Sequence, residues 1–162
     1  MNREPALLAN HVNRTVTGPM WHGPALAHVL DGVSHEQAAA RPLADMHSIW
    51  EIVLHATAWA EIARARLHGQ RLGDPPPEDD WPAVGNTGPD DWTAALDRLR
   101  ASHRELAHDV RHLDESAIAA KVDGLDYTVS NLLHGVIEHG TYHGGQIMLL
   151  RKALGVSRRP GP

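Results

Sequence analysis

Hydrophobic and polar positions follow the period of an α-helix along much of this chain, most clearly over residues 128–155. Apolar and small residues recur there at steps of three and four, and this spacing places them on one helix face because each residue advances about 100° around the axis. The residues of this face are Leu132, Val136, His139, Gly140, His143, Ile147, Leu150 and Leu154. The pattern therefore predicts a long amphipathic helix with two histidines on its buried face.

Three further stretches, residues 3–17, 48–67 and 90–113, show the same period. Ser34 and Ser48 each open a capping box, in which a serine and a Glu or Gln three residues later bond the first backbone amides of a helix. No segment has the alternating pattern of a convincing strand. We therefore predict an all-α fold, a four-helix bundle with a long crossover loop and short accessory helices, in one domain spanning residues 1–162.

Residues 68–89 supply the crossover loop. They are rich in Gly, Pro and Asp and include Pro75-Pro76-Pro77, so no regular element is expected in them. A loop of this length either contributes to function or simply joins the ends of two parallel helices. Trp81 within it is a candidate wall for a pocket.

The interior of the last predicted helix contains four glycines, each of which costs about 1 kcal/mol relative to alanine. They are Gly135, Gly140, Gly144 and Gly145. Either a neighbouring helix approaches closely at these positions, or they leave open volume for a ligand beside the histidines. The sequence leaves both explanations open.

Composition narrows the classes of function. The chain has 162 residues, a net charge of −5, a pI near 6.2 and no cysteine, which excludes a disulfide scaffold, a thiolate nucleophile and cysteine metal ligands. Basic residues are scattered apart from Arg158 and Arg159, so nucleic acid is not an expected partner. Neither a signal peptide nor an apolar run of membrane-spanning length is recognisable. We expect a soluble cytoplasmic protein without a membrane partner.

The histidines carry the candidate chemistry. His139 and His143 are one helical turn apart on the buried face, a geometry that one metal ion can bridge. His55 lies on the core-facing stripe of the helix over residues 48–67, so a third imidazole points inward. The alternative is that all three are ordinary core histidines with hydrogen-bonded rings. Because the chain has 13 histidines, about one His-x-x-x-His pair is expected by chance, and spacing alone is weak evidence.

Several neighbours are weaker candidates. Glu51 lies one turn before the inward histidine of its helix and either caps that helix or supports the metal. His103 faces inward on the helix over residues 90–113 and is the best candidate for an additional contact. His134 is interpreted as a packing residue or an outer contact of the site, and Gln146 as a hydrogen-bonding residue rather than a ligand. Tyr142 and most tryptophans are expected to serve packing. His108 and His112 form a second His-x-x-x-His pair, and we expect this pair to face solvent.

Two segments, His47-SIWEIVLHATAW-Ala60 and Leu133-HGVIEHGTYHGGQIMLLRKALG, resemble the DinB/YfiT-like superfamily of small helical proteins. The resemblance implies a four-helix bundle, commonly dimeric, that binds a divalent metal through three histidines. Transferred residue by residue, these ligands are His55, His139 and His143. Zinc suits three imidazoles best, and nickel, iron or manganese are compatible with them.

The resemblance also guides the functional expectation. Some relatives are S-transferases that use low-molecular-weight thiols, and others are mycothiol-dependent isomerases. We expect a homodimeric, metal-dependent enzyme that acts on a small molecule, with thiol S-transfer as the leading reaction and metal-assisted hydrolysis as the alternative. Two hypotheses of another class are a non-catalytic metal-binding stress protein and a metal-free bundle whose apolar face serves dimerisation.

Overall fold

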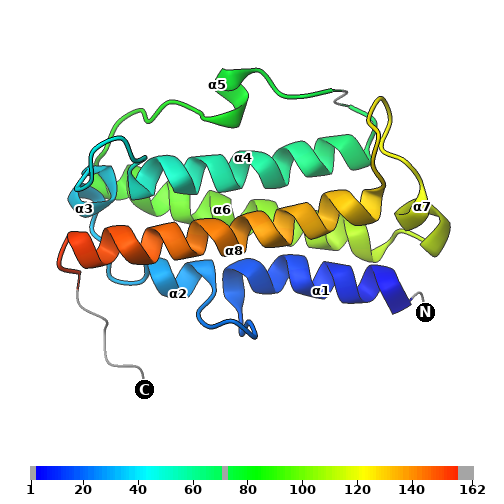
Figure 1. The fold of residues 1–162 in the computed structure, drawn as a ribbon, viewed down its shortest axis with the longest axis horizontal. Helices are drawn as coiled ribbons and strands as arrows, with labels where there is room; N and C mark the ends of the chain where they lie inside the picture. Colours follow the sequence, from blue (N-terminus) through cyan, green and yellow to red (C-terminus); the bar gives the residue numbers. More distant parts are fainter. Residues whose placement is uncertain (1–2, 71–72, 157–162) are drawn as a thin grey trace.

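Four long helices form the body of the computed structural model, which describes residues 3–70 and 73–156. They are α1 (Arg3–Thr17), α4 (Ile49–Leu67), α6 (Pro89–Arg111) and α8 (Val129–Ala153). Helices α6 and α8 each pack against both α1 and α4, so the four close into a bundle. Figure 1 shows that α1 and α8 run in one direction and α4 and α6 in the other. The predicted all-α bundle is confirmed.

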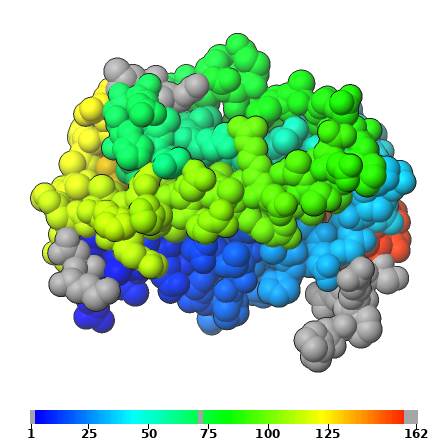
Figure 2. Space-filling model, turned by 180° about the vertical axis from the view of Figure 1, so that it is seen from behind, coloured from blue at the N-terminus to red at the C-terminus, as the bar shows by residue number. Residues whose placement is uncertain are grey.

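Short helices occupy the connections between the long ones. They are α2 (Leu26–Leu30), α3 (His35–Ala39), α5 (Pro77–Asp80) and α7 (Glu115–Ala119). Helices α2 and α3 lie at the end of the bundle where α4 begins, and α7 lies at the opposite end (Figure 1). From behind, α6 runs between α1 and α2 on one side and the crossover loop on the other (Figure 2). Within the described chain, no helix has the length and apolar character needed to span a membrane.

Side-chain caps mark where helices α3, α4 and α8 begin. Ser48 accepts a hydrogen bond from the Glu51 amide, and the Glu51 carboxylate accepts one of 2.7 Å from the Ser48 amide. The same reciprocal box opens α3 at Ser34. Thr128 caps α8 by accepting from the Asn131 amide at 3.2 Å. The capping boxes predicted at Ser34 and Ser48 are therefore confirmed, and each cap satisfies an amide that has no partner within its helix.

Among its described residues, the crossover between α4 and α6 contains one short helix, so the expectation of no regular element was wrong for residues 77–80. Pro77 is the first residue of α5, a position where its fixed φ suits a helix and its missing N–H is no loss. The Trp81 amide donates to the Pro77 carbonyl at 2.9 Å and ends the turn. Helix α5 lies over α4 while the chain returns to the start of α6 (Figure 1).

Two of the glycines of α8 illustrate both proposed explanations. A Cβ on Gly140 would lie 2.3 Å from Cγ2 of Thr15, so the Thr15 methyl group of α1 fills the space that a side chain there would need. A Cβ on Gly135 would meet nothing within 4 Å, and Gly135 lines an open cavity beside His139. Close approach accounts for the first position, and open volume accounts for the second.

The apolar core consists of two clusters along the bundle. The first gathers α2, α3, the first turns of α4 and α6, and the end of α8, and the second gathers α1, α7, the later turns of α4 and α6, and the start of α8. Between them every long helix contributes a buried polar side chain. These are Thr15 of α1, His55 of α4, Ser102 and His103 of α6, and His143 of α8. A polar layer thus crosses the middle of the bundle, and burying it requires partners for its polar atoms.

The tryptophans divide between core and surface. Trp50 and Trp92 are buried in the first cluster, as expected, and the Trp92 indole donates to the Val33 carbonyl at 3.0 Å. Trp21, in contrast, is fully exposed in the turn after α1. Trp21 is the exception to the expectation that most tryptophans serve packing, because the turn that closes between Met20 and Gly23 points its side chain outward.

Candidate metal centre

The three histidines singled out from the sequence meet inside the bundle. His55 lies on α4, while His139 and His143 lie one turn apart on α8. Nε2 of His139 is 2.9 Å from Nε2 of His55 and 3.0 Å from Nε2 of His143. One nitrogen of each ring lies within 4.8 Å of the others, and the group could hold a metal ion. The structure therefore brings together all three predicted residues.

The outer nitrogens of two of these rings reveal which nitrogen carries the proton. Nδ1 of His55 lies 2.6 Å from the backbone carbonyl of Asp80, and a carbonyl only accepts, so this Nδ1 carries hydrogen. The amide nitrogen of Gln146 donates to the Tyr142 hydroxyl at 3.0 Å, which turns its carbonyl oxygen toward Nδ1 of His143 at 2.6 Å. In the neutral form both rings therefore present an unprotonated Nε2 to the centre.

This arrangement suits a cation better than a hydrogen-bonded cluster of histidines. Nε2 of His139 faces two nitrogens that both carry lone pairs, and with at most one proton it can donate to only one of them. A divalent cation accepts all three lone pairs at once. Nitrogens about 2.0–2.1 Å from a zinc ion lie on the order of 3 Å from one another, which matches the observed separations.

Burial keeps the three imidazoles neutral. It lowers the pKa of His139 to about 3, with the neighbouring His143 and His55 as further causes. It also lowers the pKa of His143 to about 4, against the opposing hydrogen bond to Gln146. The pKa of His55 is lowered by burial and partly restored by Asp80. Since only an unprotonated imidazole nitrogen binds a metal, these shifts favour ligation at neutral pH.

The crossover loop completes the wall beside His55. The Trp81 ring stacks on the His55 ring with centroids 3.8 Å apart, which confirms Trp81 as a pocket wall. Asp80 contributes twice, because its backbone carbonyl accepts from His55 and its carboxylate accepts from the Trp59 indole at 2.6 Å. Sequence reasoning did not find Asp80, since every residue has a carbonyl and only the path of the loop selects this one.

Other candidates lie outside the group. The Glu51 carboxylate caps α4 and pairs with Arg41. His103 is buried, with Nδ1 bonded to the Leu99 carbonyl at 3.0 Å. His134 is exposed, so its interpretation as a packing residue was wrong. His108 and His112 are exposed to solvent, as expected. Gln146 has the predicted hydrogen-bonding role, because its side-chain oxygen accepts a hydrogen bond from Nδ1 of His143.

A cavity opens on each side of the histidine group. One of about 510 Å³ lies between α4 and α8 and has His139 in its wall. Another of about 260 Å³ has His143 in its wall, together with Trp81 of the crossover loop. Both cavities therefore reach a ligand candidate from different directions.

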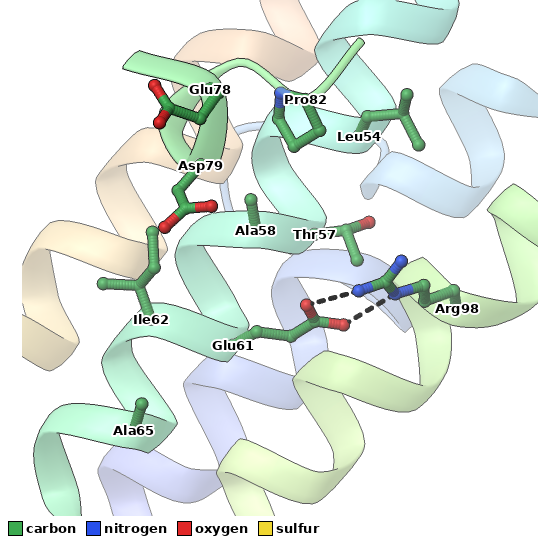
Figure 3. A pocket seen from close by; sticks show the side chains of 10 residues that line it. All are labelled: Leu54, Thr57, Ala58, Glu61, Ile62, Ala65, Glu78, Asp79, Pro82 and Arg98. Carbon is green, nitrogen blue, oxygen red and sulfur yellow. Dashed lines mark hydrogen bonds and ion pairs between the residues drawn. The ribbon is translucent and has the colours of Figure 1, made fainter. Parts of the chain in front are cut away.

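A further cavity, of about 420 Å³, lies away from the histidines between α4, α5 and α6. Figure 3 shows it with Glu61 and Arg98 joined by two hydrogen bonds on one side and the acidic residues of α5 on another. Its ion pair is already satisfied, and no histidine lines it. The histidine group is therefore the candidate functional site.

Comparison with known sequences identifies the family of the chain. No curated protein and no solved structure shows significant similarity to the chain. The sequence model of the DinB superfamily, however, matches residues 21–147, a range that contains all three histidines and the whole crossover loop. The chain belongs to the DinB superfamily.

Proposed function

We propose that His55, His139 and His143 bind one divalent cation through their Nε2 atoms and that the protein is a metal-dependent enzyme acting on a small molecule. The observation that carries this proposal is the convergence of nitrogens whose outer partners leave them unprotonated. Three protein ligands fill part of a coordination shell, so water or substrate completes it. When bound, such a cation acts as a Lewis acid and lowers the pKa of a coordinated water or thiol.

The protein's own residues then orient and shield the site. The Asp80 carbonyl and Gln146 hold two of the rings by their Nδ1 hydrogens, which fixes ring rotation and raises the basicity of the opposite nitrogen. Trp81 covers one face of His55 and keeps water from that side. A rigid, partly dry site of this kind requires little reorganisation during reaction.

The two cavities support a transfer reaction. A group transfer needs two organic partners near one centre, and a cavity reaches the histidines from each side. Hydrolysis needs only one organic substrate besides water. We therefore propose thiol S-transfer as the reaction, with zinc as the metal, and keep hydrolysis as the second candidate because the same cation also activates water.

Metal content tests the first part of the proposal. The purified full-length chain should contain about one equivalent of a divalent metal by elemental analysis, and His139→Ala should lose most of it while circular dichroism shows unchanged helical content. His134→Ala is the matched control, since it removes an exposed histidine of the same helix. Equal metal content in both variants would show that the site is elsewhere.

Reaction assays test the second part. A low-molecular-weight thiol with 1-chloro-2,4-dinitrobenzene reports S-transfer, and 4-nitrophenyl acetate without thiol reports hydrolysis. We expect turnover in the first assay, its loss in His139→Ala and its retention in His134→Ala. Turnover only in the second assay would favour the hydrolase. A metal-loaded protein inactive in both assays would favour the non-catalytic binding protein.

A further inference from the structure

Arg66 of α4 is a buried cation without a counter-ion. It is 5% exposed, and it donates to the Tyr127 hydroxyl at 2.6 Å and to the Gly73 carbonyl at 2.7 Å. Both partners are neutral. Its Nε is buried and has no hydrogen-bond partner, and in the described part of the chain no carboxylate forms an ion pair with this guanidinium. Two of its five N–H groups are thus bonded to protein acceptors.

A buried charge in this condition is unfavourable unless something compensates for it. The rings of Trp59 and Tyr127 lie 5.6 and 6.0 Å from the guanidinium carbon and provide part of the compensation through their π faces. Cation–π contacts of this kind offset only part of the free energy that burial of an ion costs. The residual charge makes Arg66 suited to an anionic ligand.

The position of Arg66 identifies where that ligand would lie. Arg66 lines the cavity of about 510 Å³ that also has His139 in its wall. Trp59 connects the two, because its ring lies 5.9 Å from the His139 ring and 5.6 Å from the Arg66 guanidinium carbon. One small molecule can therefore reach both. Between them the cavity wall is largely apolar, with Leu132 and Val136 of α8.

We propose that this cavity binds a small organic acid, with its carboxylate at Arg66 and its apolar body against Trp59 and Val136. Guanidinium groups bind carboxylates with two parallel hydrogen bonds, which gives both affinity and orientation. The direction of binding rests on the proposed function, in which the reacting end of the molecule points toward His139. The anion site itself depends only on Arg66 and the cavity.

One charge opposes the binding of an anion. Asp74, in the crossover loop, also lines the cavity, where it is exposed and forms no ion pair with Arg66. Its carboxylate repels an incoming anion, although the field of an exposed charge is weakened by water. Removing this charge should therefore strengthen binding, the opposite of removing Arg66.

The probe pair is benzoate and its neutral counterpart benzamide, titrated into the full-length protein by calorimetry or ligand-observed NMR. We expect benzoate to bind more tightly than benzamide. Arg66→Met should weaken benzoate by about ten-fold or more and leave benzamide unchanged, since only the anion gains from the guanidinium. Asp74→Asn should tighten benzoate by about two-fold or more.

A steric pair tests the cavity without touching Arg66, whose replacement also removes two bonds to the fold. Gly135→Leu places a side chain in the cavity, where a Cβ meets nothing within 4 Å, and should abolish benzoate binding. Gly145→Leu is the same change on the same helix, also in open space but lining a different cavity, and should bind benzoate normally.

Chelation separates this proposal from the metal centre. Benzoate should still bind after the metal is removed, and it should bind to His143→Ala. If binding depends on the metal and is equal in wild type and Arg66→Met, the anion site is refuted while the metal proposal stands. If no metal is found but Arg66-dependent binding of benzoate persists, the metal proposal is refuted while the anion site stands. Benzamide binding as tightly as benzoate, or benzoate binding to Gly135→Leu, also overturns the proposal.

Discussion

Trp81 stacks on His55 with ring centroids 3.8 Å apart and planes 4° from parallel. It stacks on His47 in the same manner, at 3.6 Å and 10°. The residue before it, Asp80, supplies the carbonyl that accepts from Nδ1 of His55. The crossover loop therefore determines the orientation of this imidazole as much as α4 does, and the loop and the proposed metal centre form one structural unit.

Trp81→Ala should weaken metal binding by about ten-fold, because loss of the stacking frees both the His55 ring and the neighbouring carbonyl; outer partners of metal ligands typically contribute 10–100-fold. Competition with a calibrated chelator measures the change. Trp21→Ala is the control, since it is the same change at a fully exposed tryptophan. Equal affinities in the two variants would show that the loop merely covers α4.

Gln146→Leu should lower metal affinity by about 10–100-fold, because Nδ1 of His143 loses its acceptor and the ring loses its fixed tautomer. Gln146→Glu should retain or increase affinity, since a carboxylate accepts the same hydrogen bond and makes the ligand nitrogen more basic. The two variants are compared in the same chelator competition. A loss of affinity in Gln146→Glu equal to that in Gln146→Leu would contradict the orienting role.

Gly140→Ala should destabilise the protein by about 1–2 kcal/mol in denaturant unfolding, because its Cβ would lie 2.3 Å from Cγ2 of Thr15 and overpacking outweighs the better helix propensity of alanine. Thr15→Ser removes that methyl group and keeps the hydroxyl, so the double variant should recover the loss. Gly135→Ala, in open space, should instead stabilise by about 1 kcal/mol. A destabilising effect that persists in the Thr15→Ser background would place the cause elsewhere.

The long helices and the inward histidines could be predicted because both depend on the same local property, the helical period. His139 and His143 share a face by spacing alone, and His55 shares one with its apolar neighbours. The helix caps could be predicted equally well, because a capping box pairs residues that lie three apart in the sequence. The role of Glu51 could not be predicted from the sequence, because a residue at this position can either cap the helix or support the metal. The structure resolves it through the Ser48 amide and Arg41, which engage the carboxylate.

Contacts across the bundle could not be predicted. The Asp80 carbonyl, the Trp59 bridge and the orphaned Nε of Arg66 depend on how a loop folds back over α4, and no residue type in that loop encodes its path. Helix α5 was missed for a related reason. A run of prolines usually signals irregular chain, yet its last member is well placed as the first residue of a helix.

His103 should make stability depend on pH. Complete burial lowers its pKa from 6.5 to about 4 in the folded protein. The unfolded chain therefore takes up the proton first, so stability is full above pH 6.5 and falls as the pH drops toward 4. At pH 5 the loss from this residue is about 2 kcal/mol. Denaturant unfolding at pH 8 and pH 5, with chelator present, measures it.

His103→Leu separates this contribution from those of the other histidines. The pKa values of His139 and His143 are also lowered by burial, so they add a loss of the same sign, but they remain in the variant. The stability difference between pH 8 and pH 5 should therefore shrink by about 2 kcal/mol in His103→Leu, whatever the absolute stability of the variant is. An unchanged difference would mean that His103 stays unprotonated in the unfolded chain as well, or that the buried ring gains a proton without cost.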